Sequence, residues 1–320
     1  MSTGEGTKGA GTCPSCGDVD AEVIGRGHDF EYRSLPDSFS VLRCRRCGHG
    51  RLDPVPAPEQ LATIYPSTYY TINPRSPIYF EGFMRRIKIR RDVDRIVGLA
   101  GTRPRSIVDL GCGDADRLVS LRGRLGSAVE LVGVDLQPDP GRVAELRRHQ
   151  IEIAEGNIED GLGVLADGAH DLMIMCQIIE HLYDPFGAVK TIAKKLAPGG
   201  RLLIETPNLG GPDFNRFKDR YWGGYHFPRH FQFFTPRTLA GAVEDAGLKV
   251  RSRGFIPSGF AIVSVRNRLG LTSIERGNRF GEFLNMRNLA VVAATTAFDL
   301  ACIAAGRETS NQFVLAERPA

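Results

Sequence analysis

The sequence predicts an α/β fold, with a mostly parallel sheet that carries helices on both faces and a small cysteine-rich domain in front of it. Two observations support this prediction. Between residues 106 and 252, short apolar segments suited to buried strands alternate with segments that can form helices. Ahead of them, residues 13–47 contain two Cys-x-x-Cys motifs. A chain of 320 residues is long enough for one large domain and one small one.

The composition is that of an ordinary globular protein, with 42% hydrophobic and 24% charged residues. The net charge of +4 is too small to indicate nucleic-acid binding by itself. Residues 1–10 are expected to be a disordered leader, because the N-terminus lacks the apolar segment of a secretory signal. We therefore expect a cytoplasmic protein, and in that reducing compartment paired cysteines favour metal binding over disulfides.

The N-terminal cysteines predict a zinc ribbon over residues 11–55. They form two CxxCG motifs with a strand-rich loop between them: Cys13, Cys16, Cys44 and Cys47. Each motif places two thiolates on one tight turn, and four thiolates complete a tetrahedral, structural zinc site without an open position. A redox pair would require a single motif ahead of a helix. Because no ligand position is vacant, His28 and His49 are expected at the surface.

Residues 56–100 are predicted to form a linker and a helical lid segment. Prolines stiffen the exit from the ribbon, and a short helix follows over residues 59–65. A longer amphipathic helix is predicted over residues 83–99. Its basic side chains form either a solvated face or a surface that attracts an anionic substrate or a membrane. They are Arg85, Arg86, Lys88, Arg90 and Arg91.

The rest of the chain is organised around residues 106–135. A short apolar strand is followed by Gly111-Cys-Gly113, a helix, a second apolar strand and Asp135. This is the plan of a nucleotide-binding βαβ unit, in which glycines let a ligand approach the backbone and the carboxylate holds a ribose. Asp116 replaces the third glycine of the dinucleotide fingerprint. Three acids make the turn a poor pyrophosphate site and suit a ligand with a ribose and a cationic end: Asp109, Asp114 and Asp116.

The remaining elements continue the alternation. Helices are predicted over residues 142–149 and 238–246. A third helix is predicted to begin at residue 185, to include Leu196 and to end at the Pro-Gly-Gly segment 198–200. Strands are predicted at residues 151–158, 171–176, 201–208, 248–252 and 311–318. The apolar segment 289–305 contains Asp299 and is marginal in length for a membrane span. It is expected to be a buried or docking helix, with membrane-surface contact as the alternative.

Three motifs resemble one family. Residues 108–115, VDLGCGDA, resemble the first motif of class I S-adenosylmethionine-dependent methyltransferases. Residues 180–185 fit a pattern, EHLxDP, that is frequent in small-molecule methyltransferases of that family. A zinc ribbon, a proline-rich exit and a Tyr-Tyr pair at residues 69–70 resemble a bacterial subgroup of it. The resemblance implies a Rossmann-like, mostly parallel seven-stranded sheet, with S-adenosylmethionine bound by residues 101–254. Residues 255–320 would supply cap helices and the final strand.

The resemblance also implies how the cofactor is bound. The turn that follows Asp109 would face the methionine end, and Asp135 would hold the ribose. Asn157 would bond the adenine amine, and Ile158 would pack on the ring. The whole expected set is Asp109, Gly111, Gly113, Asp135, Leu136, Asn157, Ile158 and Cys176. In the subgroup the tyrosine segment folds over the pocket as a lid, and interdomain packing is the alternative for Tyr65, Tyr69 and Tyr70.

Candidate catalytic residues lie at the same edge. Methyl transfer from a sulfonium is an in-line displacement that needs no metal, and it needs a base only if the acceptor must lose a proton. Glu180 and His181 follow a strand at the cofactor edge, and His226 lies in a loop rich in aromatic, basic and imidazole groups. The alternatives are packing or capping near Asp184 for His181, and a structural hydrogen bond for His226.

The loop at residues 221–230 also supplies candidates for binding the acceptor. With the lid tyrosine they are Tyr70, Trp222, Tyr225, Arg229 and His230. Arg229 could hold a phosphate or carboxylate through its planar fork. Trp222, the only tryptophan, could form an aromatic wall or stabilise a cation. For His230, as for His226, a structural hydrogen bond is the alternative.

The sequence therefore predicts methyl transfer to oxygen or carbon of a small-molecule acceptor, which can be anionic or lipid-like. One alternative is C-methylation of a prenyl diphosphate. Others are an RNA-modifying methyltransferase and a non-catalytic, cofactor-binding interaction protein. Nucleic acid is not the expected partner, because residues 176–179 read Cys-Gln-Ile-Ile where enzymes acting on exocyclic amines carry an [DN]-P-P-[YF] turn. Peripheral membrane contact is compatible with the basic helix, and the sequence defines no oligomeric state.

Overall fold

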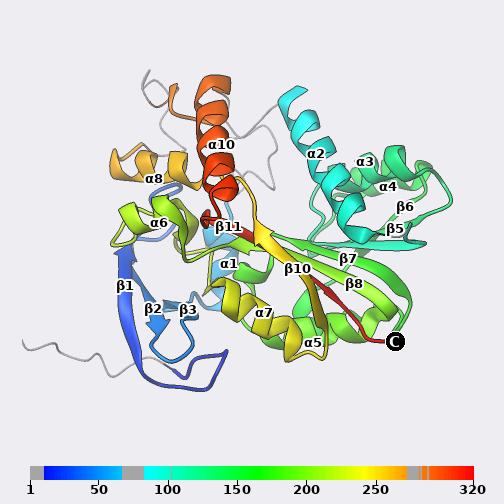
Figure 1. The fold of residues 1–320 in the computed structure, drawn as a ribbon, viewed down its shortest axis with the longest axis horizontal. Helices are drawn as coiled ribbons and strands as arrows, with labels where there is room; N and C mark the ends of the chain where they lie inside the picture. Colours follow the sequence, from blue (N-terminus) through cyan, green and yellow to red (C-terminus); the bar gives the residue numbers. More distant parts are fainter. Residues whose placement is uncertain (1–10, 67–82, 102, 272–280, 282, 287) are drawn as a thin grey trace, which may run out of the picture.

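The computed structural model describes residues 11–66, 83–101, 103–271, 281, 283–286 and 288–320. Its main sheet has seven strands in the order β10-β11-β8-β7-β4-β5-β6 (Figure 1). Strand β11 pairs antiparallel with both β10 and β8, and every other pairing in this sheet is parallel. The predicted mostly parallel, seven-stranded sheet is confirmed. The strands are β4 (Ser106–Leu110), β5 (Glu130–Asp135), β6 (Ile151–Glu155), β7 (His170–Cys176), β8 (Leu196–Pro207), β10 (Lys249–Phe255) and β11 (Asn311–Glu317).

Helices cover both faces of this sheet (Figure 1). One face is packed by α2 (Phe83–Ala100), α3 (Asp116–Leu125) and α4 (Pro140–Arg148), which bury apolar side chains such as Val93, Leu118 and Leu146. The other face is packed by α5 (Pro185–Lys195) and α7 (Pro236–Glu244), through Ile192 and Leu239 among others. Burying such a side chain stabilises the fold by about 1.5–3 kcal/mol. The two layers therefore hold the strand ends of the sheet in fixed positions.

A second, four-stranded sheet has the order β1-β2-β3-β9. Its first three strands are β1 (Ala21–Gly27), β2 (Phe39–Cys44) and β3 (Gly50–Asp53), and the fourth, β9 (Gln232–Phe233), comes from the other half of the chain. Aromatic side chains of residues 214–233 complete the core of this sheet, where they pack with Phe39, Val41 and Leu52. The N-terminal segment and the loop before β9 therefore share one hydrophobic core.

Short elements join these sheets. Before α2 come the 3-10 helix η1 (Pro58–Gln60) and α1 (Leu61–Ile64). Between the strands of the main sheet lie η2 (Ile158–Asp160), η3 (Ile179–His181), α6 (Gly211–Phe217), η4 (Gly223–Tyr225), α8 (Phe260–Arg268) and α10 (Leu289–Ala304).

Several predicted boundaries differ from the structure, among them the start of α7 and the end of α5. Helix α7 begins at Pro236 and not at residue 238, because Thr235 caps it by accepting the Thr238 N–H. Helix α5 ends at Lys195, and strand β8 already begins at Leu196, which is partnered with His170. The Pro-Gly-Gly segment thus lies within the range of β8 and does not end the helix.

Helix α10 is not the buried helix that its apolar sequence predicts. Of its 16 residues only Asp299 and Cys302 are buried, while Leu289, Phe298 and Leu300 are each more than half exposed. Asp299 accepts a hydrogen bond from the Ser258 N–H, which explains the acid inside an apolar helix. In the part of the chain that the structure describes, no helix combines the length and the apolar character needed to cross a membrane.

Candidate active site and cysteine cluster

The glycine turn after β4 lies at the carboxyl edge of the main sheet. Gly111 has φ +68°, and a Cβ there would overlap the side chain of Ile178, so only glycine fits. Gly113 has φ +55° and faces open space. Its N–H donates to Asp135 Oδ2 over 2.8 Å, at the end of β5. The predicted juxtaposition of the glycine turn and Asp135 is thus present, with room for a ligand at the backbone.

The neighbouring strand ends supply the other predicted cofactor residues. Leu136 follows Asp135 and is 61% exposed, so its side chain is accessible to a ligand at this edge. Ile158 is buried in the core below η2. Asn157 Oδ1 already accepts the Glu159 N–H over 3.0 Å as the cap of η2. Cys176 ends β7, and burial raises the pKa of its thiol well above the ordinary value, so it is neutral.

The acids of the turn are already paired with arginines. Asp109 is fully buried and accepts two hydrogen bonds, of 2.7 and 2.9 Å, from Nη1 of Arg117. Asp114 forms an ion pair with Arg85, and Asp116 Oδ1 lies 3.2 Å from Arg142 Nη2. The expectation that free acids attract a cationic ligand end is therefore corrected, because these charges are balanced within the chain. The Asp109–Arg117 pair was not foreseen from the sequence.

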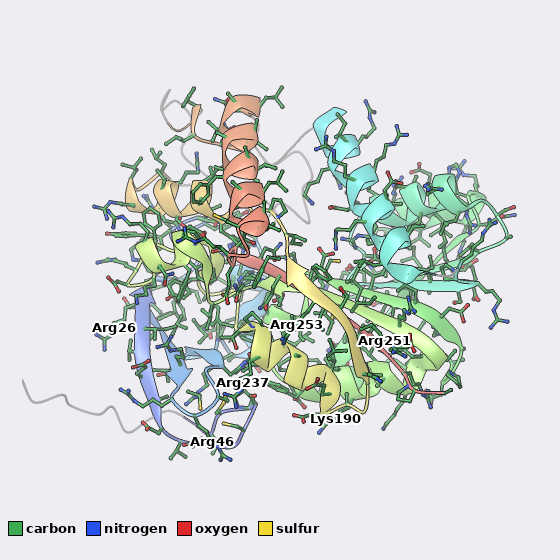
Figure 2. The ribbon with its side chains drawn as sticks, in the orientation of Figure 1. Arg26, Arg46, Lys190, Arg237, Arg251 and Arg253 are labelled. Carbon is green, nitrogen blue, oxygen red and sulfur yellow. The ribbon has the colours of Figure 1, made fainter. Side chains whose placement is uncertain are left out.

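Some basic residues of α2 form ion pairs within the chain, and others are exposed. Arg85 turns toward the glycine turn, and Arg95 pairs with Glu205 at the end of β8. Lys88 pairs with Asp92 one turn further along the helix, and the other three basic residues of the predicted patch are exposed. A further exposed group lies over α5, α7 and β10 and includes Lys190, Arg237 and Arg253 (Figure 2).

Glu180, His181 and His230 meet beside the cofactor edge. Glu180 is fully buried, and its Oε2 accepts a hydrogen bond of 2.8 Å from Thr206 Oγ1. Its Oε1 has no hydrogen-bond partner among the described residues and lies 4.0 Å from His230 Nε2. The rings of His181 and His230 are 4.7 Å apart, edge to face. We call these three residues the Glu-His-His cluster.

Backbone carbonyls orient both histidines of the cluster. His181 Nδ1 lies 3.0 Å from the Arg229 carbonyl oxygen and 2.9 Å from the Tyr65 hydroxyl. His230 Nδ1 lies 2.8 Å from the Gly224 carbonyl oxygen. Burial raises the pKa of Glu180 to about 8, although the hydrogen bond from Thr206 acts to lower this pKa. Burial, with the charge of His226 as a second cause, lowers the pKa of His181 to about 3. The imidazoles are therefore neutral.

The structure corrects the roles predicted for three acceptor-binding residues, because their side chains are fully buried. The Trp222 indole lies against Phe214 and Tyr225 and donates to Asp213 and Ser310. The Tyr225 hydroxyl donates to the Lys218 carbonyl over 2.7 Å. These side chains build the core of the N-terminal sheet.

Arg229 is the third of these residues. Its guanidinium forms an ion pair of 2.9 Å with Asp29, and both side chains are inaccessible to solvent. It therefore cannot reach a substrate phosphate in this structure. His226 lies 3.2 Å from Glu31, and its ring centroid is 5.0 Å from that of His230. Tyr69 and Tyr70 lie outside the described residues.

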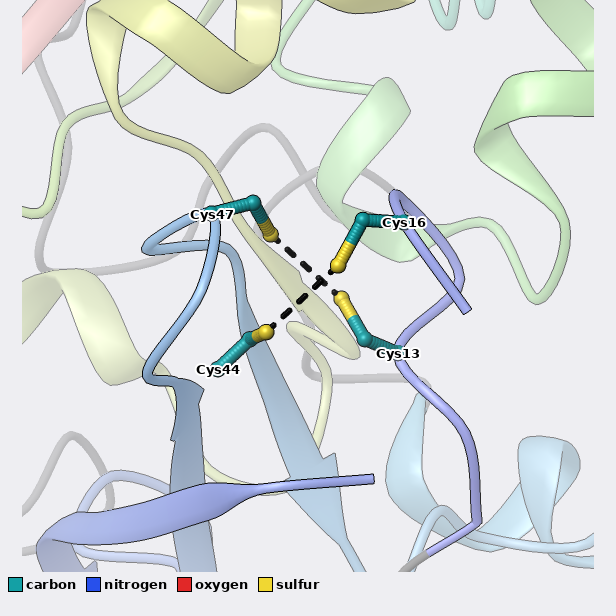
Figure 3. A group of neighbouring side chains, drawn as sticks. All are labelled: Cys13, Cys16, Cys44 and Cys47. Atoms are coloured by element: carbon teal, nitrogen blue, oxygen red, sulfur yellow. Dashed lines mark hydrogen bonds between the residues drawn. The ribbon is translucent and has the colours of Figure 1, made fainter. Parts of the chain in front are cut away.

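The four N-terminal cysteines converge on one point, which lies between two turns (Figure 3). The Sγ atoms of Cys13 and Cys47 are 3.6 Å apart, as are those of Cys16 and Cys44. These distances exclude disulfides, and they match the sulfur separation of about 3.8 Å that tetrahedral ligation at about 2.3 Å requires. The His49 N–H donates to Cys47 Sγ. The set fits a zinc ion.

His49 itself is not at the surface, as the sequence suggested. It is fully buried, and its Nε2 lies 3.0 Å from Gln232 Oε1 on β9. His28 is partly buried and packs against Phe30. This burial could not be predicted from the sequence, because the hydrogen-bond partner of His49 lies about 180 residues further along the chain.

Comparison with known proteins identifies a family. A family model described as a methyltransferase domain matches residues 80–253. The chain is 29% identical over 189 residues to the ubiquinone biosynthesis O-methyltransferase of Xanthomonas euvesicatoria pv. vesicatoria (strain 85-10), covering 55% of this chain and 72% of that protein. It is 33% identical over 176 residues to the protein of the same name from Cupriavidus pinatubonensis (strain JMP 134 / LMG 1197), covering 51% and 66%.

Solved structures share the fold at low identity. One is the Burkholderia thailandensis 1,6-didemethyltoxoflavin-N1-methyltransferase, with a TM-score of 0.53 and 12% identity over 91% of this chain and 99% of that one. Another is the cyclase SpnF, with a TM-score of 0.52 and 17% identity over 83% and 98%. The names of these two proteins describe different reactions, so the shared fold does not define the reaction of this chain.

Proposed function

The chain belongs to the family of S-adenosylmethionine-dependent methyltransferases, and we propose that it methylates a hydroxyl oxygen of a small molecule. One observation carries the proposal: a buried carboxylate with two neutral imidazoles lies beside the edge of the sheet where the cofactor would bind. A hydroxyl must lose its proton as it attacks a methyl group, whereas an amine can attack first. The relatives named as O-methyltransferases agree with an oxygen acceptor.

The residues of the cluster would divide the work between them. Glu180, whose pKa is raised to about 8, would accept the hydroxyl proton in its ionised form, which becomes more populated as the pH rises above neutral. His181 is the least buried of the three and would face the acceptor. His226 lies behind His230 and would tune its charge. Holding the acceptor oxygen and the methyl group in line would supply much of the rate, up to roughly 7–11 kcal/mol in favourable cases.

The cofactor would lie across the open side of the glycine turn. S-adenosylmethionine supplies an electrophilic methyl group on a sulfonium centre. Asp135 would hold the ribose hydroxyls, and Leu136 and Ile158 would enclose the adenine, with Asn157 and Cys176 at its border. Gly111 and Gly113 would admit the methionine end. We propose that Arg117, with one nitrogen on Asp109, presents its guanidinium to the methionine carboxylate.

A structural zinc ion is proposed for the four cysteines. It would fix the two turns that carry them and, through β2 and β3, the sheet that β9 completes. Because that sheet shares its core with residues 214–233, the zinc ion would stabilise the loop that positions His226 and His230. Its role would be to hold the fold, since four thiolates leave no position open for a substrate.

C-methylation of a prenyl diphosphate loses its main support. It relied on Trp222 to stabilise a cationic intermediate and on basic residues to hold the diphosphate. Trp222 is in the core, and Arg229 is paired with Asp29. A hollow of about 500 Å³ does have basic side chains, Arg237 and Arg253, but its lining includes none of the Glu-His-His cluster.

The test is a comparison of acceptor classes. The full chain would be incubated with S-adenosylmethionine and, in parallel, with catechols and other phenols, sugars, prenyl diphosphates and RNA, and each product would be analysed by mass spectrometry. We expect S-adenosylhomocysteine and an O-methyl product from a phenol or sugar. Methyl transfer only to carbon of a prenyl diphosphate, or only to RNA, would refute the proposal.

A further inference from the structure

We infer that Glu180, His181 and His230 form a second metal site, which binds a divalent cation of the zinc class. One ligand atom from each residue lies within 4.8 Å of the other two. Two of the three residues are fully or almost fully buried, and they come from segments about 50 residues apart. The reaction proposed above does not require this cation, so the metal site is a separate property of the chain.

The hydrogen bonds around the two imidazoles determine where their protons are. A carbonyl oxygen can only accept, so His181 donates its Nδ1 hydrogen to Arg229 and His230 donates its Nδ1 hydrogen to Gly224. In a neutral imidazole the other nitrogen is then a bare lone pair. Nε2 of each ring is therefore free to act as a ligand. A metal-bound histidine typically has this arrangement, with its second nitrogen held by a carbonyl or a carboxylate.

Glu180 presents the third acceptor. Thr206 holds its Oε2, which leaves Oε1 buried and without a hydrogen-bond partner among the described residues. Oε1 and His230 Nε2 lie 4.0 Å apart, and in the ionised acid neither carries a proton. An unpaired buried oxygen of this kind keeps the full cost of its removal from water. A single proton could join only one pair of these acceptors, whereas one cation can bind all three.

The ligand set selects the metal. Two imidazoles and one carboxylate are the protein ligands of many catalytic zinc sites, which keep a fourth position open. Tetrahedral ligation at about 2.1 Å would bring the ligand atoms to about 3.4 Å from one another. The present limit of 4.8 Å between these atoms is wider, so the three side chains would have to move closer together around the ion. Thr206 and the two carbonyls already fix the outer shell, which such sites need for affinity.

The open position gives the site a consequence for the reaction, and this part alone rests on the proposed function. A hydroxyl oxygen bound to a divalent cation has a lowered pKa, so the acceptor would release its proton to water before its oxygen takes the methyl group and S-adenosylhomocysteine leaves. The cation would then replace Glu180 as the group that makes the oxygen nucleophilic. Glu180 would serve as its anionic ligand.

The first experiment counts metal ions. The full chain is equilibrated with Zn²⁺, freed of loosely bound ions, and its zinc content is measured by mass spectrometry. We expect two zinc ions per chain in the wild type and one in His230→Asn and in Glu180→Gln. The asparagine amide can replace Nδ1 in the bond to Gly224, and glutamine can still accept from Thr206, so both variants keep their outer contacts. One zinc ion in the wild type, or two in both variants, would overturn the inference.

A matched control is available in His170. It is also a buried histidine, with Nδ1 bonded to Ser106 and with an Nε2 that has no partner among the described residues. His170→Asn should keep two zinc ions, because His170 belongs to no group of potential metal ligands among the described residues. Loss of a zinc ion in this control would show that any buried histidine change releases metal, and would overturn the inference.

A second measurement separates the metal site from the methylation reaction. Co²⁺ is added to protein whose cysteine cluster is already filled with zinc. We expect ligand-field absorption without thiolate charge-transfer bands, and its absence in His230→Asn. A wild type that shows no cobalt absorption but still methylates a phenol would overturn the metal site and leave the proposed function intact. Cobalt absorption without any methyl transfer would support the site and count against the function.

Discussion

The cysteine cluster and the Glu-His-His cluster are both compact sets of potential ligands, but they are built in different ways. The cysteines come in pairs two residues apart, and each pair occupies one turn, so the local sequence already places the thiolates. Glu180 and His230 meet only after β7, β9 and the elements between them, among them α5 and β8, have folded. The first cluster helps to create the fold around it, and the second is created by that fold.

The largest expected effect follows from Cys44→Ser. Four thiolates bind zinc with an apparent free energy of about 10–16 kcal/mol in small domains, and much of this is folding free energy. We expect loss of the zinc ion and unfolding of the N-terminal sheet. Trp222, the only tryptophan, lies in the core of that sheet, so its fluorescence should shift to the red.

The control for this prediction is Cys302→Ser. Cys302 is also buried and free, but it lies in α10, away from the cluster. Its substitution should cost about 1–3 kcal/mol and leave the zinc content and the tryptophan spectrum unchanged. If Cys44→Ser kept both its zinc and its native fluorescence, the cysteine cluster would not be a structural element.

The next effect concerns the second cluster, where the change should affect rate more than stability. Glu180→Gln keeps the bond from Thr206 and removes the charge. We expect kcat to fall by about 10²–10⁴, the usual contribution of a group that promotes proton loss, with little change in cofactor affinity. Steady-state kinetics with a phenol acceptor measures kcat, and calorimetry measures the cofactor Kd.

Glu159→Gln is a suitable control for Glu180→Gln. Glu159 is also a glutamate at the carboxyl edge, in η2, where it accepts the Asp184 N–H in an exposed position. Its substitution should change kcat less than about threefold. The lost hydrogen bond typically contributes about 0.5–1.5 kcal/mol to the stability of the fold, and it is the same in the ground state and the transition state. Equal losses in the two variants would mean that the cluster has no special role.

The sequence predicted those parts of the site that depend on local order along the chain. Two CxxC turns, the glycine turn after β4 and Asp135 at the end of β5 are all readable because backbone geometry alone places them. The mostly parallel, seven-stranded sheet follows from the resemblance to a known family. Each of these predictions uses contacts between neighbouring residues or neighbouring strands.

Contacts between distant residues could not be predicted in this way. His49 is buried because β9 pairs with β3, and Trp222 lies in the core because the N-terminal sheet needs its aromatic ring. Asp109 is paired with Arg117 from the first turn of α3. A loop rich in aromatic residues resembles a binding loop in sequence, and only the fold shows that its large side chains point into a core.

The buried ion pair Asp29–Arg229 connects the two regions. Asp29 belongs to the loop after β1, and the Arg229 carbonyl orients His181. Asp29→Asn would remove the buried negative charge that faces the Arg229 guanidinium and should cost about 3–5 kcal/mol in the free energy of unfolding. Denaturant titration measures this value. Glu22→Gln, which breaks a half-exposed pair with Arg43, should cost less than about 1 kcal/mol.

The same pair predicts a pH dependence. Burial alone would raise the pKa of Asp29, but the Arg229 guanidinium and hydrogen bonds from Ser34 and Tyr32 lower it to about 2. Because the pKa of Asp29 is lower in the folded state, its ionisation stabilises the fold at pH values above the unfolded pKa of about 4. This contribution to the free energy of unfolding, roughly 2 kcal/mol, is lost as the pH falls through 2. Asp29→Asn should therefore show a shallower loss of stability between pH 5 and pH 3. An unchanged slope would show that Asp29 is not held ionised by Arg229.

The smallest effect is expected at the cofactor edge, which is exposed and therefore tolerant. Asp135→Ala removes the acceptor proposed for the ribose hydroxyls. A hydrogen bond to a charged group contributes about 1.5–3 kcal/mol. We therefore expect a roughly 10- to 150-fold rise in the cofactor Kd. The Gly113 N–H, which now donates to Asp135, is exposed and can donate to water, so the melting temperature should hardly change. Asp160→Ala, at an exposed position of η2, is the control for calorimetric binding of S-adenosylhomocysteine. Equal affinities in the wild type and Asp135→Ala would show that the ribose lies elsewhere, although the fold and both buried clusters would be untouched.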